Sequence, residues 1–335
     1  MIRSGGNESR VAREFLQIVI ESAYGVPKAS PTAGTEKINV RLSGGNAFTI
    51  IGDPVWFEVM YGGGEATPAF ADTDQFECTG QLTTEFYGSQ AKFFSDWFGQ
   101  KINAGQTTPW TTTEPPGDLP SCSVYHAVQR SDGTYKRIRF PGTKVETWAI
   151  ECSREQKYAK LTLGLRSQKW VGNPYDASSD PTSTEFPAPA DTDYPTDVFK
   201  FIDLKGNLTI DSSRTAFSSI ALKAVNKLDA QWFEDRFLYL LRRLGRSSTL
   251  DASVLYKPTP DDLASYQALT ALATSIRFDN GVNFFQCSMN AQNKLKKVGK
   301  SLEVDRVYQL PLSLQNYWDP VAGTDLTITA GAVTP

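Results

Sequence analysis

The sequence predicts a mainly β protein made of two tandem β-sandwich or half-barrel cores, each with one flanking α-helix. Apolar and polar residues alternate over several stretches of 132–170, which is the period of half-buried strands. A Pro-rich acidic segment at 171–197 divides the chain in two. On both sides of it the order of elements is strand, helix, hairpin and closing strands, although residue identity between the halves is low.

In the first half, residues 76–87 are predicted to form a strand and residues 88–99 a short helix. Ser89 is a candidate N-cap for this helix, and Gly99 stands where a helix terminator is expected. The following hairpin is predicted from the Asp132-Gly133 turn.

Further strands follow, and we expect Pro141-Gly142 to punctuate the first of them. Strands over 145–152 and 159–165 are joined by a polar turn. Alternation in the last strand places leucines on one face, namely Leu161, Leu163 and Leu165, and polar residues on the other, namely Lys160, Thr162 and Arg166.

The second half repeats this order with a strand over 248–256, a helix over 259–272 and a hairpin around Asn280-Gly281. Thr259 and Pro260 would begin the helix, and Asn-Gly is the strongest short-range hairpin signal. The closing strands, within 304–317, carry a polar face made of Gln309, Ser313 and Gln315.

These elements predict five segments. They are an N-terminal extended arm (1–43), a first core (44–170), a linker (171–197), a second core (198–320) and a C-terminal extended tail (321–335). The linker has five prolines, six acids and no base, so it should bury too little apolar surface to offset its ordering entropy. We expect it to be a linker or an extended surface arm.

The connection before residue 248 carries apolar residues at helix-like spacing, as far as Leu244, among several arginines. A core helix that covers a sheet would explain this stripe. An arm that packs on a neighbouring subunit would also explain it, because arginine and aromatic residues are enriched at interfaces. The second interpretation names six contact residues: Trp232, Phe233, Arg236, Phe237, Arg242 and Arg243.

The sequence offers no constellation for catalysis, and no metal or cofactor site is predicted. His126, the only histidine, lies mid-strand, where a structural role is expected. The four cysteines lack CxxC spacing and should be unbridged core thiols of a cytoplasmic protein. No apolar run approaches the roughly 18 residues of a membrane span, and the N-terminus is unlike a signal peptide. The net charge of -3, without a dense Lys/Arg cluster, argues against high-affinity nucleic-acid binding.

Three stretches match a known pattern: ESAYGVPKASPTAG, ECTGQLTTEFYGSQAKFFSDW and RSDGTYKRIRFPGTKVETWAIECSREQKYAKLTLGL. On these stretches the chain resembles the tail tube proteins, or major tail proteins, of long-tailed bacteriophages. In that family a strand leads into a short helix, and a hairpin then leads to a G-x-K-V-x-x-W/L strand. Here that strand contains Gly142, Lys144, Val145 and Trp148. The fold implied is two tandem tail-tube-like cores.

The resemblance implies a structural virion protein and not an enzyme. Six such cores form a ring, and rings stack into a hollow tube through which DNA is ejected. With two cores per chain, three copies would form a pseudo-hexameric ring; without the duplication, the ring would need six. The implied partners are copies of the chain itself, the tape measure, tail terminator and distal tail proteins, and DNA only in transit. No membrane partner is implied. The protein would be assembled in the host cytoplasm and reside in the virion tail.

In such a tube the leucine-rich faces would meet the sandwich core and the polar faces would line the lumen. The lumen-facing residues would then be Lys160, Thr162, Arg166, Gln309, Ser313 and Gln315. Two alternatives stay open. One is another tail component of the same fold, such as a distal tail or tube-terminator protein. The other is a carbohydrate-binding β-sandwich module, for which the seven tryptophans could supply a groove.

Overall fold

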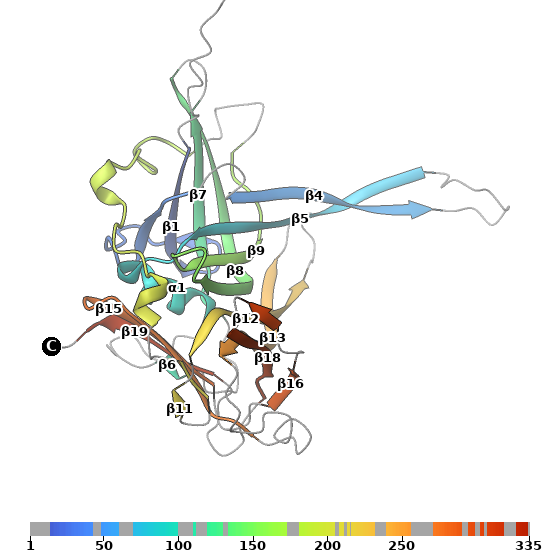
Figure 1. Ribbon diagram of the computed structural model, residues 1–335. Coiled ribbons are helices and arrows are strands. Elements are labelled where there is room, and N and C mark those ends of the chain that lie inside the picture. The colour runs from blue at the N-terminus through green and yellow to red at the C-terminus, as the bar shows by residue number, and fades with distance from the viewer. Residues whose placement is uncertain are drawn as a thin grey trace, which may run out of the picture.

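The computed structural model consists largely of antiparallel strands, and the residues it describes contain one α-helix (Figure 1). The expected mainly β class is confirmed. The described residues are 14–42, 48–59, 70–99, 110–111, 119–129, 133–172, 181–204, 208–210, 213–214, 216–231, 239–255, 271–289, 294–298, 302–304, 307–317 and 326–333.

Eight strands lie side by side in what we call the large sheet, and each pairs antiparallel with its neighbours. In spatial order they are β4 (Phe48–Val59), β5 (Phe70–Glu85), β9 (Lys160–Ser167), β8 (Tyr135–Ser153), β12 (Phe217–Gln231), β13 (Leu240–Leu255), β18 (Val307–Gln315) and β16 (Lys294–Val298). A short strand, β17 (Leu302–Val304), follows β16 along the same edge of β18.

Alternating side chains produce this sheet, as the sequence predicts. In β9, Leu161, Leu163 and Leu165 are at most 1% exposed, whereas Lys160 on the opposite face is exposed. The tight turn between β8 and β9 contains Lys157 at a positive φ of 65°. One face of the large sheet therefore contributes to the hydrophobic core.

Strand β8 belongs to two sheets because it bends at Pro141-Gly142. Before the bend it pairs with β7 (Cys122–Gln129), and after the bend it pairs with β9 and β12. Gly142 has a φ of 64°, a conformation that glycine adopts without strain. The dipeptide therefore redirects the strand and does not interrupt it, contrary to our expectation.

Two outer sheets cover the core. The first adds β1 (Glu14–Ala23), β2 (Val26–Pro27) and β3 (Lys37–Val40) to β7. The second contains six strands in the order β11 (Ser213–Arg214), β10 (Leu208–Ile210), β14 (Thr274–Asp279), β15 (Asn283–Met289), β19 (Leu326–Ala332) and β6 (Trp110–Thr111). The Asn280-Gly281 hairpin is confirmed between β14 and β15, with Gly281 at a φ of 83°.

Both chain ends contribute strands, which the expectation of extended terminal arms did not include. β1 lies between β3 and β7, and β19 lies between β15 and β6. Their side chains explain this placement, because β19 buries Leu326, Ile328 and Ala330 in alternation.

Helix α1 (Gly88–Phe98) matches the predicted helix and ends at Gly99, whose N–H donates to the Ser95 carbonyl at 2.9 Å. Its start differs from the prediction, because Tyr87 occupies the N-cap position. Ser89 lies in the first turn, where its N–H and hydroxyl donate to the two carboxylate oxygens of Asp197 at 2.6 and 2.7 Å. An acid from a distant segment thus satisfies the helix N-terminus.

The helix lies between the two halves of the chain. It contacts β8 from the first half and β15 and β19 from the second. Phe98 stacks on Trp148 of β8 at 4.5 Å between ring centroids, and Phe86, just before the helix, meets Phe285 of β15 edge-on at 5.1 Å. The second expected helix, over 259–272, falls almost wholly outside the described residues.

The described part of the acidic linker packs on the first half. Phe186 is fully buried, and its ring lies 4.8 Å from that of Phe15 and 5.2 Å from that of Tyr125. Two short 3-10 helices follow, η2 (Asp191–Asp193) and η3 (Phe201–Leu204). Apart from Pro181 and Phe186, the side chains of 181–197 that the structure describes are exposed or half-buried, which agrees with the expectation of little burial, but one aromatic side chain anchors the segment.

The prediction of a helix in the stripe before residue 248 is wrong from Leu240 onward, because β13 begins there. Burial there alternates, with Leu241 and Arg243 buried and Arg242 and Leu244 exposed. Pairing with β12 gives these residues a strand conformation despite their helix-like spacing. The predicted contact residues Trp232, Phe233, Arg236 and Phe237 lie outside the described residues.

Candidate assembly surfaces

The face of the large sheet opposite the core, which we call the open face, is mainly polar. The strand register aligns its side chains in rows that cross six strands. One row holds Glu85, Lys160, Glu151, Ala221, Asp251 and Ser313. The next holds Thr83, Thr162, Ala149, Lys223, Thr249 and Gln315.

The structure brings the predicted lumen-facing residues together on this one sheet. Lys160, Thr162 and Arg166 come from β9, and Ser313 and Gln315 come from β18, with three strands between them. The sixth, Gln309, lies in β18, with its side chain outside the described part of the structure.

Two cations of the open face, Arg166 and Lys223, are paired with acids within the sheet. Arg166 forms ion pairs with Glu77 and, at 3.7 Å, with Glu146. Lys223 lies 3.5 Å from Glu151 across the junction of β12 and β8. Because cations and anions alternate, the face does not present the continuous positive surface that phosphate binding requires.

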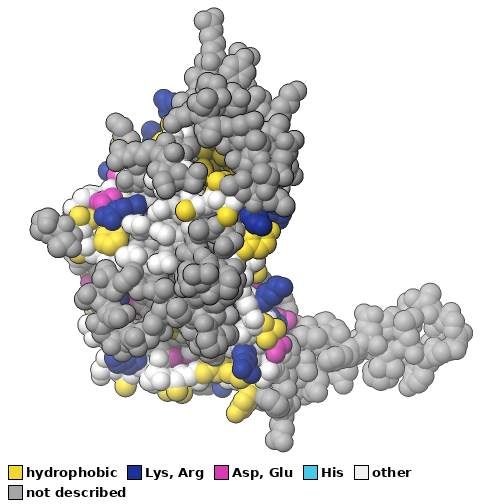
Figure 2. All heavy atoms as spheres, turned by 90° about the horizontal axis from the view of Figure 1, so that it is seen from below, with side chains coloured by type: hydrophobic (Ala, Val, Ile, Leu, Met, Phe, Trp, Pro, Cys, Tyr) yellow, Lys and Arg dark blue, Asp and Glu magenta, His cyan; other side chains and the backbone are white. Residues whose placement is uncertain are grey.

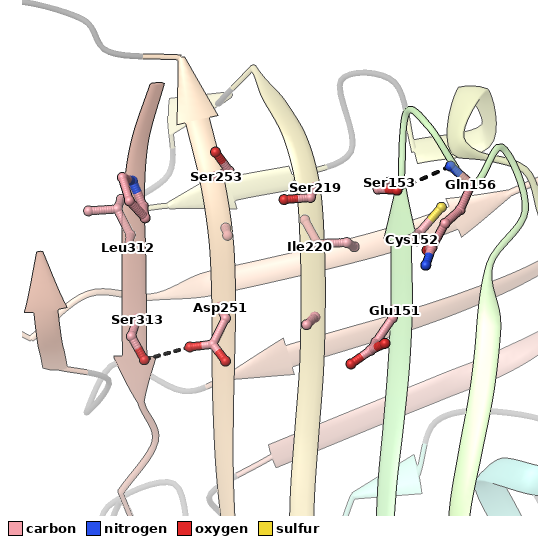
Figure 3. Close-up of a pocket in the computed structure, with 13 residues that line it drawn as sticks. Glu151, Cys152, Ser153, Gln156, Ser219, Ile220, Asp251, Ser253, Leu312 and Ser313 are labelled. Atoms are coloured by element: carbon pink, nitrogen blue, oxygen red, sulfur yellow. Dashed lines mark hydrogen bonds between the residues drawn. The ribbon is translucent and has the colours of Figure 1, made fainter. Parts of the chain in front are cut away.

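A shallow groove of about 510 Å³ lies over four strands of the large sheet, β8, β12, β13 and β18 (Figure 3). Glu151, Asp251 and Ser313 lie along it, and the Ser313 hydroxyl donates to Asp251 at 2.6 Å. Ser153, Ser219 and Ser253 form a second row nearer the β8–β9 turn. Apolar residues, among them Ile220, Pro311 and Leu312, also line the groove, so its lining is mixed.

The large sheet is built from two sets of strands paired in the same order. The first set is β4-β5-β9-β8 and the second is β12-β13-β18-β16. The outer strands also correspond, since β1 pairs with β7 as β10 pairs with β14, and β7 pairs with β8 as β14 pairs with β15. The two sets meet where β8 pairs with β12.

This arrangement places β4 at one edge of the large sheet and β16 at the other. Within the described residues, neither edge strand has a second strand partner on its outer side. The β4–β5 hairpin extends well beyond the body of the protein (Figure 1), and we call its projecting part, 53–59 with 70–76, the arm. Exposed strand edges of this kind readily pair with another chain.

The connection before residue 248, residues 226–247, was predicted to contact another subunit, but part of it packs within its own chain. Asn226 donates to the carbonyls of Val145 and Phe98, and the buried Lys144 donates to the Leu241 carbonyl at 2.5 Å. Arg243 is only 3% exposed, so Arg242 is the arginine of this pair that can reach another chain.

Potentially reactive side chains are held in structural roles. His126 lies in β7 with its Nε2 2.5 Å from Glu14. All four cysteines are buried thiols, as predicted, and burial raises the pKa of Cys152 to about 12. Among the described residues, no three His, Cys, Asp or Glu side chains group as metal ligands, and no helix is long and apolar enough to cross a membrane.

A family profile described as phage tail tube protein matches residues 12–304, which is most of the chain. The chain belongs to the phage tail tube protein family. A comparison with curated proteins gives no match. Membership confirms the resemblance drawn from the sequence and identifies a structural component of the virion tail.

For a tail tube protein, surfaces matter more than pockets, and the described surface is mixed in character. Seen from below, apolar side chains and side chains of both charges are interspersed (Figure 2). The sequence predicted the polar strand faces correctly but did not predict the arm. One feature of the sequence does distinguish the region that contains the arm: residues 48–85 contain acids and not one Lys or Arg.

Proposed function

We propose that this chain is the tube-forming subunit of a phage tail, and that three copies close into a ring whose stacked repeats form the conduit for DNA. The observation that carries the proposal is the matched strand order of the large sheet. If the two four-stranded sets are tandem copies of one core, the β8–β12 junction is a template for the contact between chains. β16 of one chain would then pair with β4 of the next, and the contact closes a ring.

Ring width supports three copies. Three chains would supply about 24 strands, which at about 4.8 Å each close into a barrel roughly 37–50 Å wide, depending on strand tilt. After side chains are allowed for, this accommodates a DNA duplex of about 20 Å. Six eight-stranded chains would give a barrel about twice as wide.

The open face supports the assignment of the lumen. Inside a water-filled tube, polar residues should face the channel, and charges paired within the sheet would let DNA slide without strong attachment. Lys160, Thr162, Arg166, Ser313 and Gln315 would then lie near passing DNA, as would Gln309 if alternation continues along β18. Tape measure, terminator and distal tail proteins would meet the tube at its lumen and ends.

Electron microscopy and native mass spectrometry of the purified chain test this proposal. Stacked rings are expected, with a ring mass of about 111 kDa for three chains of 37.0 kDa. A mass of about 222 kDa would show six chains and overturn the trimeric ring. Single rings that never stack would favour a terminator or distal tail protein.

Thiol labelling tests which face lines the channel. Thr162→Cys should react with a bulky maleimide polymer in the unassembled chain and become protected in the tube. Lys28→Cys, on the outer-sheet side of the chain, is the matched control and should stay reactive. The four native cysteines are buried and give little background. Equal reactivity of both positions in assembled tubes would refute the assignment.

A further inference from the structure

The two outer edges of the large sheet carry opposite charges. Strands β4 and β5 contain no Lys or Arg, and the arm carries four acids: Asp53, Glu58, Asp72 and Asp74. Strand β16 has the sequence KLKKV, with Lys294, Lys296 and Lys297 and no acid. Asp and Glu are therefore concentrated at one edge and lysine at the other.

The opposite charges also lie at corresponding ends of the two four-stranded sets, although the strands are staggered, so that within one chain Gln315 shares a row with Thr83 and not with Cys78. The arm begins beyond Cys78, which pairs with Ser167 at the end of β9. Lys294 pairs with Gln315 at the end of β18, the second-half counterpart of β9. If β16 of one chain meets β4 of the next in the register of the β8–β12 junction, the lysines and the arm acids are brought to the same level.

The junction inside the chain has the reverse polarity. There, beyond its bend, β8 supplies two acids, Glu146 and Glu151, beside the buried Lys144, and β12 supplies two bases, Lys223 and Lys227, and one acid, Asp229. Lys223 and Glu151 form an ion pair across it at 3.5 Å. In the contact within the chain, most of the acids are on β8 and most of the bases on β12. In the proposed contact between chains, the counterpart of β8, β16, carries the bases, and the counterpart of β12, β4, carries the acids.

We propose that charge determines which edges pair, so that the acidic arm of one chain docks on the lysine edge β16 of the next. This inference rests on the proposed function. Acidic β4 edges repel each other, as do lysine-rich β16 edges, which disfavours pairing of like edges. β4 is also repelled by the acids of β8, so it does not take the place of β12 during folding. Lysines on an edge strand can simply prevent aggregation, but that role does not require an acidic partner edge.

The test is charge reversal with rescue. The edge variant carries Lys294→Glu, Lys296→Glu and Lys297→Glu, and its matched control replaces the same lysines by Arg. The combined variant adds Glu58→Lys, Asp72→Lys and Asp74→Lys to the edge variant. Ring and tube formation is followed by sedimentation and electron microscopy at low and high salt, after circular dichroism has shown that each unassembled variant is folded.

The edge variant should need roughly tenfold more protein for half-maximal assembly, whereas the Arg control should behave as wild type. The combined variant should assemble within about threefold of wild type, and salt should weaken wild-type assembly. Wild-type behaviour of the edge variant, or no rescue in a folded combined variant, would overturn the inference. If the wild-type chain forms no rings in any salt, the proposed function fails and this inference with it; tubes that ignore charge reversal overturn this inference alone.

Discussion

Asp197 joins the linker, helix α1 and the β14–β15 hairpin, so Asp197→Ala should weaken the contact between the two halves. Its carboxylate accepts hydrogen bonds from the N–H and hydroxyl of Ser89 and, at 3.0 Å, from the side chain of Asn283. Loss of the helix-terminal contact costs about 1 kcal/mol, and loss of the other two bonds adds about 1–2 kcal/mol. The free energy of unfolding should therefore fall by about 2–3 kcal/mol.

Urea denaturation of the unassembled chain measures this loss. Asp197→Asn keeps one acceptor and should lose about half as much free energy. The matched control is Asp193→Ala in the same segment, whose exposed carboxylate caps a local turn by accepting from the Ala190 N–H at 2.8 Å; this change should cost less than about 1 kcal/mol. The reasoning is refuted if Asp197→Ala and Asp193→Ala have equal effects.

Three further substitutions test the core, the strand bend and a surface turn. Trp148→Ala removes a side chain that is 1% exposed and should cost about 3–5 kcal/mol in urea unfolding; a loss below about 1 kcal/mol would contradict its place in the core. Gly142→Ala adds a Cβ 2.7 Å from the Gln168 side chain and should lower the melting temperature more than Gly133→Ala, where no atom lies within 4 Å. Hydrogen bonds from Lys28 and a backbone amide lower the pKa of Glu36 to about 2, so its contribution is present above about pH 4.5 and is lost as the pH falls toward 2. Glu36→Gln should remove this part of the acid sensitivity, measured by proteolysis of the 28–37 turn across that pH range.

The sequence predicted the parts of the fold that local patterns control. Alternation in β9, the turn at Asn280-Gly281 and the end of α1 at Gly99 all depend on residues close in sequence, and each is confirmed. The polar face of the large sheet was predictable for the same reason, because strand alternation assigns faces without knowledge of partners.

Long-range partners explain what the sequence did not reveal. Leu240 to Leu244 have helix-like spacing but form a strand because β12 pairs with them. Ser89 resembles an N-cap, yet the acid at the helix terminus comes from position 197. Phe186 lies in a segment too polar to fold alone and is buried because the first outer sheet provides its pocket.

Strand β8 has a mechanical consequence. Because β8 runs as one continuous strand from the first outer sheet into the large sheet, this connection contains no loop that could absorb a displacement. A force applied to the first outer sheet is therefore transmitted to the large sheet through the backbone of β8. It is then transmitted to the second half through the hydrogen bonds between β8 and β12. If the chain forms the tube proposed above, the wall should respond to bending as one stiff layer, with compliance left to the contacts between chains.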